Sequence, residues 1–71
     1  MLKYTIMLEK AGTNYSAYCP DLPGCIATGS TAEEVTQRMK EAIDFHIEGL
    51  KRENIPIPEP STKAVSIDIA T

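Results

Sequence analysis

The sequence predicts a small α+β domain in which one amphipathic helix covers one face of an antiparallel sheet. Three observations predict it: an alternating apolar pattern near the N-terminus, a helix-start signal followed by an apolar stripe, and a second alternating pattern near the C-terminus. The expected order is three antiparallel strands, one amphipathic helix and one returning strand. Because one helix covers only one side of a sheet, the other side is expected to face water or a partner.

The length and the charge limit the possible functions. We expect a single domain, residues 1–71, since a second domain would need about 100 more residues. A core of this size contributes about 3–5 kcal/mol, so we expect self-association into a dimer or tetramer. Seven basic and ten acidic residues give a net charge of -3, which argues against nucleic-acid binding and favours a basic protein partner. With no apolar run of about 20 residues and no signal-peptide pattern, we expect a cytoplasmic protein without membrane contact.

The first half of the chain predicts a hairpin and a third strand. Leu2–Glu9 alternates between apolar and polar residues, which is typical of a half-buried strand. Turn-forming residues at Lys10–Asn14 lead to a second short strand, Tyr15–Cys19. After the Pro20–Gly24 break, Cys25–Thr28 is expected to be the third strand. The alternation does not reveal which residues of the second and third strands face the helix.

The next segment carries the strongest local signal. Ser30–Glu34 contains two overlapping capping boxes, which predict the start of a helix. An apolar stripe follows at three- and four-residue steps: Val35, Met39, Ala42, Ile43, His46, Ile47 and Leu50. Lys51 and Arg52 suit the last turn, and Asn54 suits the C-terminal cap. We therefore expect one amphipathic helix between these start and end signals.

The segment after the helix is expected to be a linker and a strand. Ile55–Pro60 has alternate prolines, which favour a stiff extended chain. Val65, Ile67 and Ile69 alternate with polar residues and predict the returning strand. The expected helix-facing side of the sheet is the more apolar set: Leu2, Tyr4, Ile6, Leu8, Val65, Ile67 and Ile69.

No catalytic, metal or cofactor site is expected from the residue pattern. Cys19 and Cys25 are two possible metal ligands where zinc needs four, so we interpret them as small buried thiols, with a redox pair as the alternative. A single histidine on an apolar stripe, His46, is more often a packing residue than a general base. The carboxylates are scattered, with Asp44 on the helix and Asp68 on the last strand. We therefore do not expect an enzyme.

One loop is a candidate partner-binding site. It places a leucine, expected to be exposed, between two prolines, and its candidate residues are Tyr18, Asp21, Leu22 and Pro23. Leu22 is the expected apolar anchor. The alternative is a plain connection, in which Asp21 caps the turn and Gly24 takes a positive φ.

Several motifs together resemble a known family. Tyr18-x-Pro20-Asp21-Leu22-Pro23-Gly24-Cys25, then the Gly29–Glu34 helix start, Glu41-Ala42-Ile43 and the proline-rich tail are similar to the HicB family of antitoxins in its short, UPF0150-like form. The resemblance implies a partial ribonuclease-H-like fold (β-β-β-α-β) without the nuclease's acidic cluster. It also implies a binding module for a HicA-type toxin, a small basic mRNA-cleaving protein, whose RNA-binding and catalytic surface it covers.

Two further interpretations of function remain open at this point. Many HicB proteins carry an additional DNA-binding module, but here the chain ends at Thr71 directly after the last expected strand, so operator binding is not expected.

The first alternative to an antitoxin is an orphan oligomeric module that binds a small ligand or has a regulatory role. The second is a small hydrolase or nuclease, against which the scattered carboxylates count.

Overall fold

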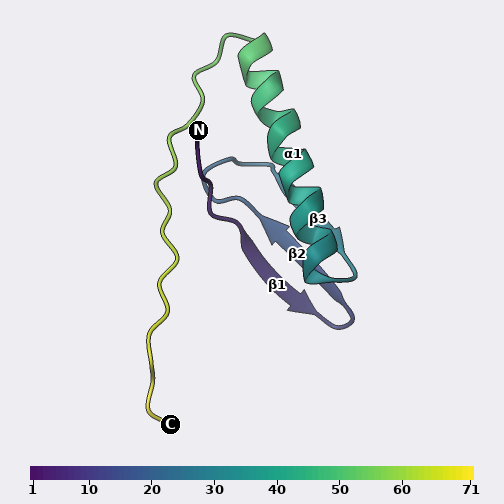
Figure 1. The fold of residues 1–71 in the computed structure, drawn as a ribbon, viewed down its shortest axis with the longest axis vertical. Helices are drawn as coiled ribbons and strands as arrows, with labels where there is room; N and C mark the ends of the chain where they lie inside the picture. The colour runs from purple at the N-terminus through teal and green to yellow at the C-terminus, as the bar shows by residue number, and fades with distance from the viewer.

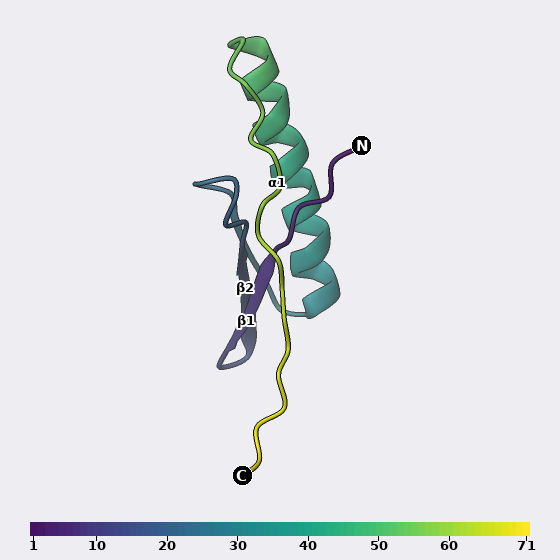
Figure 2. The same ribbon diagram turned by 90° about the vertical axis from the view of Figure 1, so that its left-hand side faces the viewer.

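The fold consists of a three-stranded antiparallel sheet with one helix on one of its faces. The computed structural model describes residues 1–71, with strands β1 (Met7–Ala11), β2 (Asn14–Tyr18) and β3 (Ile26–Gly29) and helix α1 (Ala32–Arg52). The strands lie in the order β1-β2-β3, and α1 runs obliquely across them (Figure 1). Seen from the side, the helix occupies only one side of the sheet (Figure 2). The α+β class with three antiparallel strands and a helix is confirmed.

The register of the sheet fixes which side chains face the helix. Leu8 lies opposite Ala17, which in turn lies opposite Ala27, and all three are on the helix side with the buried core. The expectation that the even-numbered side chains of the first strand face the helix is therefore confirmed. The strand itself begins at Met7 and not at Leu2, because β2 ends opposite Met7. The loop at Pro20 that follows β2 is not a strand, so the residues before Met7 have no neighbouring strand to pair with.

The helix begins and ends where its capping residues lie. The Thr31 hydroxyl accepts a hydrogen bond from the backbone N–H of Glu34 at 3.0 Å, as the capping pattern predicts. At the other end Asn54 adopts a left-handed φ of 57°, and the N–H of Ile55 donates to the carbonyl of Leu50 at 2.9 Å. This is the Schellman arrangement that satisfies the last carbonyls of a helix. No helix of the chain combines the length and apolar character needed to cross a membrane.

The core is small and includes a residue that the sequence pattern placed outside it. Six hydrophobic residues are buried: Ala17, Cys19, Leu22, Cys25, Val35 and Met39. The exposure expected for Leu22 is wrong, since 0% of its surface is accessible. The loop turns back on itself through hydrogen bonds from Leu22 N–H to the Cys19 carbonyl and from Cys25 N–H to the Leu22 carbonyl, each 3.1 Å long. This tight turn directs Leu22 under the helix.

The returning strand expected at Val65–Ile69 is not formed within the chain. After α1 the chain is extended, passes the N-terminal segment, and then projects beyond the end of the sheet in both views (Figures 1 and 2). Val65, Ile67 and Ile69 remain 69–79% exposed. The reason is geometric, because the chain is held at Ser61 and Thr62 and leaves this anchor at an angle to β1.

Candidate protein-binding surface

The two cysteines belong to the core of the loop. Both are buried and free, and the N–H of Cys19 donates to the carbonyl of Cys25 at 3.2 Å. The Cys25 Sγ lies 3.9 Å from the carbonyl oxygen of Ala42 on the helix. Burial raises the pKa of the Cys25 thiol, and a raised pKa lowers thiol reactivity. The geometry fits the interpretation of the cysteines as packing residues.

Asp21 is held by the segment that follows the helix. Its Oδ2 accepts the backbone N–H groups of Ser61 and Thr62, each at 3.1 Å. Its Oδ1 accepts their hydroxyl groups at 2.9 and 3.0 Å. Two further contacts lie alongside: the Tyr4 hydroxyl donates to the Pro58 carbonyl at 2.6 Å and the Thr5 hydroxyl to the Thr62 carbonyl at 3.0 Å. Asp21 therefore connects the loop to the C-terminal segment, and its oxygens are occupied within the chain.

These hydrogen bonds predict how the contact between Asp21 and the C-terminal segment responds to pH. The backbone N–H groups of Ser61 and Thr62 stabilise the charged carboxylate and lower the pKa of Asp21. A lowered pKa in the folded state means that the contribution to stability is complete above the ordinary aspartate pKa of about 3.9 and is lost as the pH falls through the lowered value. We expect the amide signals of Ser61 and Thr62 to titrate together with Asp21, with a midpoint below 3.9, in a proton–nitrogen NMR series. A midpoint for Asp21 at or above about 3.9 would contradict the prediction.

The structure separates the four loop residues that the sequence grouped together. Tyr18 and Pro23 are exposed. Asp21 accepts hydrogen bonds from the C-terminal segment, and Leu22 is in the core. Leu22 cannot serve as an exposed anchor because the loop folds it inward. Partner binding by the loop therefore remains a prediction that now concerns Tyr18 and Pro23.

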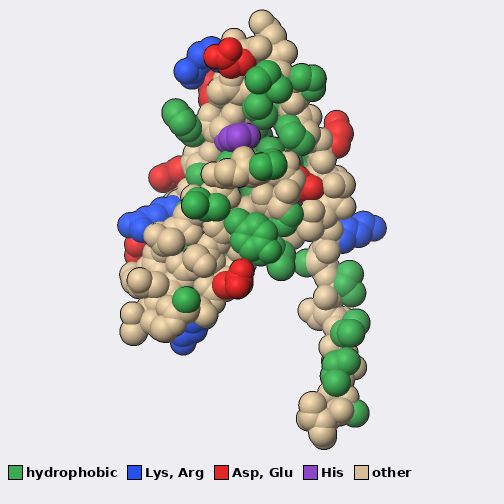
Figure 3. Space-filling view, turned by 180° about the vertical axis from the view of Figure 1, so that it is seen from behind, with side chains coloured by type: hydrophobic (Ala, Val, Ile, Leu, Met, Phe, Trp, Pro, Cys, Tyr) green, Lys and Arg blue, Asp and Glu red, His purple; other side chains and the backbone are tan.

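Tyr18 belongs to an apolar row on the sheet face away from the helix. It lies opposite Met7 on one side and Ile26 on the other, so that the three side chains are cross-strand neighbours. All three are exposed, and Ile26 reaches 70%. Sequence reasoning missed Met7 and Ile26 as partners of Tyr18, because the alternation in β2 and β3 is too short and mixed to fix their register. Seen from behind, hydrophobic side chains gather around the middle of the molecule, below the histidine (Figure 3).

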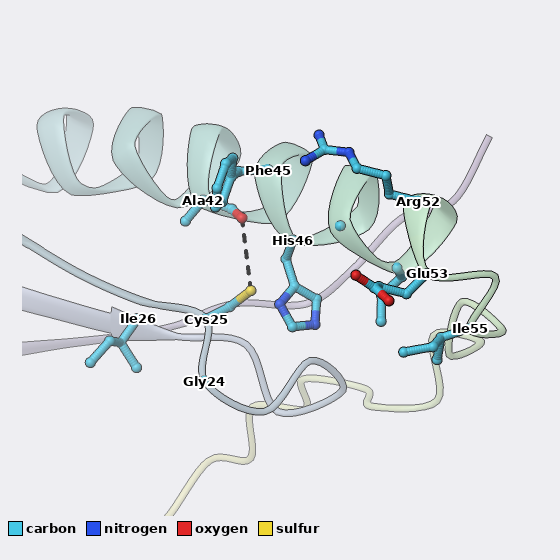
Figure 4. A pocket seen from close by; sticks show the side chains of 11 residues that line it. Gly24, Cys25, Ile26, Ala42, Phe45, His46, Arg52, Glu53 and Ile55 are labelled. Carbon is cyan, nitrogen blue, oxygen red and sulfur yellow. Dashed lines mark hydrogen bonds between the residues drawn. The ribbon is translucent and has the colours of Figure 1, made fainter.

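Next to this row lies an open groove of about 540 Å³ between the second half of α1 and the start of β3. Its lining residues include Gly24, Cys25, Ile26, Phe45, His46 and Leu50. Figure 4 shows the His46 ring directed from the helix towards the Gly24 turn, with Phe45 beside the Ala42 carbonyl. Phe45 is 76% exposed, and sequence reasoning missed it because it lies just outside the apolar stripe. His46 is half-buried on the groove wall.

We call Met7, Tyr18, Ile26 and Phe45 the apolar patch. Ile26 joins its two parts, because it is both a member of the cross-strand row and a lining residue of the groove. Large side chains exposed together on a small domain are typical of interaction surfaces. The fold and this surface define a small α+β module with an exposed apolar face.

Comparison with known proteins assigns the module to a family. The family model described as "HicB_like antitoxin of bacterial toxin-antitoxin system" matches residues 4–69, and the chain belongs to this family. The UPF0150 protein ssr1765 of Synechocystis is 46% identical over 57 residues, which cover 79% of this chain and 72% of the relative. The UPF0150 protein Ta0767 of Thermoplasma acidophilum is 36% identical over 67 residues, 93% of this chain and 97% of the relative.

A solved structure has the same fold. It is described as a "HicA3 and HicB3 toxin-antitoxin complex", and one of its chains matches with a TM-score of 0.69 and 33% sequence identity. The match covers 84% of this chain and 70% of that chain. The recognition of a short HicB-family protein from the sequence motifs is confirmed.

Proposed function

We propose that this chain is an antitoxin that binds a HicA-type, mRNA-cleaving toxin in the cytoplasm and blocks it without doing chemistry of its own. The observation that carries the proposal is the apolar patch on a fold that matches a chain of a HicA–HicB complex. A surface that a partner covers is what a binding protein needs.

Apolar contact and charge contribute to the binding in different ways. Ile26 and Phe45 are the most exposed members of the apolar patch and supply area that is removed from water on binding. The net charge of -3 favours encounter with a basic partner, and a ribonuclease surface that attracts RNA is basic. Inhibition is then steric, since the antitoxin occupies the surface that RNA would use.

The test of the proposal is a substitution in the centre of the apolar patch. Ile26→Lys places a charge where an apolar contact is expected and is predicted to weaken toxin binding by at least about 30-fold, which corresponds to a hot spot of about 2 kcal/mol. The partner in the assay is a HicA-type protein, and a short basic reading frame adjacent to this chain's gene is the first one to co-express and purify. The affinity is measured by titration calorimetry. Inhibition of the toxin's mRNA cleavage is measured in parallel.

Gln37→Lys is the matched control, because it adds the same charge at an exposed position on the helix, away from the apolar patch. We expect it to bind the toxin within about twofold of the unmodified chain, as surface substitutions away from an interface do. Equal affinity of the Ile26→Lys variant and the control would show that the toxin binds another surface. Failure of the unmodified chain to bind or inhibit the neighbouring protein would overturn the proposed function.

A further inference from the structure

The C-terminal segment has the pattern of a strand but no strand partner. Residues 63–71 carry Val65, Ile67 and Ile69 on one side and polar or small side chains on the other. The three large side chains are 79%, 75% and 69% exposed, although a half-buried strand would cover one side. Figure 3 shows hydrophobic side chains along the part of the chain that projects from the body. The segment therefore exposes β-branched side chains that favour a sheet.

A complementary open edge exists on the same molecule. β1 is an outer strand that pairs only with β2, so the N–H and C=O groups on its other side have no strand partner. Beside it, α1 packs mainly on β2 and β3 and leaves a groove of about 470 Å³ between the helix and the N-terminal segment. Tyr4, Ile6, Met39 and Ile43 are apolar residues of this groove. A fourth strand beside β1 would find backbone partners and an apolar wall together.

The anchor directs the C-terminal segment away from the β1 edge of its own chain. The Asp21 hydrogen bonds hold Ser61 and Thr62, and the prolines before them keep the chain stiff. From that point the segment and β1 diverge (Figure 1). Residues 63–71 contain no glycine, proline or asparagine that would favour a turn back to β1. Nine extended residues span about 30 Å, which exceeds the roughly 17 Å of a five-residue strand.

We propose that residues 63–70 add as a fourth strand to the β1 edge of a second copy of this chain, and that the second copy does the same in return. The exchange gives a twofold-symmetric dimer in which each segment meets an identical edge. It buries Val65, Ile67 and Ile69 against the groove beside β1 and supplies main-chain hydrogen bonds to both open edges. The small core of six buried residues makes such added burial significant for stability. The inference does not rest on toxin binding.

The experiment compares the two sides of the segment. Ile67→Lys introduces a charge on the side that would face the groove, and Ser66→Lys introduces the same charge on the opposite side. By sedimentation equilibrium we expect the full chain and Ser66→Lys to have twice the 7.8 kDa chain mass, while Ile67→Lys dissociates at least tenfold more readily. Because residue 67 is exposed and outside the core, the helical circular dichroism of the variant should be unchanged.

A second measurement separates exchange between copies from folding back. In a dimer mixed from carbon-13-labelled and unlabelled chains, filtered NMR contacts should join the Ile67 methyl groups of one copy to Leu8 or Ile6 of the other. A full chain of 7.8 kDa at high micromolar concentration, a dimer that survives Ile67→Lys, or contacts confined to one copy would each overturn the proposal. Toxin binding by Ile67→Lys is measured separately, so that failure of the dimer and failure of the antitoxin function are distinguished.

Discussion

Shortening Leu22 to alanine is expected to lower the free energy of unfolding by about 2–5 kcal/mol, the range observed for truncation of a buried leucine. Leu22 has no accessible surface and is among the largest fully buried side chains, together with Met39 and Val35. The loop around it is closed by backbone hydrogen bonds on both sides, so the structure has little freedom to collapse into the cavity. A loss of this size is comparable to the whole contribution of so small a core. We therefore expect the variant to be largely unfolded at room temperature.

Urea denaturation followed by circular dichroism measures this effect at a fixed protein concentration, because self-association adds to apparent stability. Leu2→Ala is the matched control, since Leu2 is 44% exposed, and its cost should stay below about 1 kcal/mol. Leu22→Met preserves volume and should restore most of the stability. If Leu22→Ala were as stable as Leu2→Ala, the side chain would lie at the surface, where the sequence pattern placed it.

The second large effect is expected from Gly29→Val, at about 1–3 kcal/mol or more of lost stability. Gly29 is the last residue of β3 and is buried where the chain passes under the start of α1. A Cβ atom at this position would lie 3.1 Å from the backbone N of Val35 and 3.4 Å from its Cα. Backbone atoms of a helix cannot rotate away as the end of a side chain can. The branched valine side chain would therefore push the helix from the sheet.

Gly49→Val is the control for this substitution. A Cβ atom at Gly49 would meet nothing within 4 Å, and valine is not a worse helix former than glycine. Its stability should match that of the unmodified chain within about 0.5 kcal/mol in the same urea experiment. Equal midpoints for the two variants would mean that the helix and β3 do not approach closely at Gly29.

The elements that the sequence predicted correctly depend on interactions between close neighbours in the chain. The helix start at Thr31 and its end near Asn54 follow from hydrogen bonds within one turn. The hairpin follows from turn residues, of which Gly12 adopts a positive φ of 61°. The family could be recognised because its motifs lie in short continuous segments.

The candidate site could be predicted only in part. Tyr18 is exposed, but it lies on the sheet, and its neighbours Met7 and Ile26 come from other strands. A one-residue change of register would move all of these side chains to the other face, and the mixed pattern of the middle strands does not exclude it. Phe45 was missed because helix periodicity assigns faces without showing where the sheet ends.

The two largest errors concern residues whose surroundings are distant in the sequence. Leu22 between two prolines looks exposed locally, yet it is buried because the loop folds beneath a helix that begins ten residues later. Val65–Ile69 has the alternating pattern of a strand. The pattern indicates strand character but not which strand it pairs with. The anchor of Ser61 and Thr62 at Asp21, forty residues earlier, turns the segment away from its own sheet. The sequence by itself determined the three-stranded sheet, the helix and the family, whereas the tertiary structure decided burial and the fate of the last segment, because these depend on contacts between segments that local pattern does not encode.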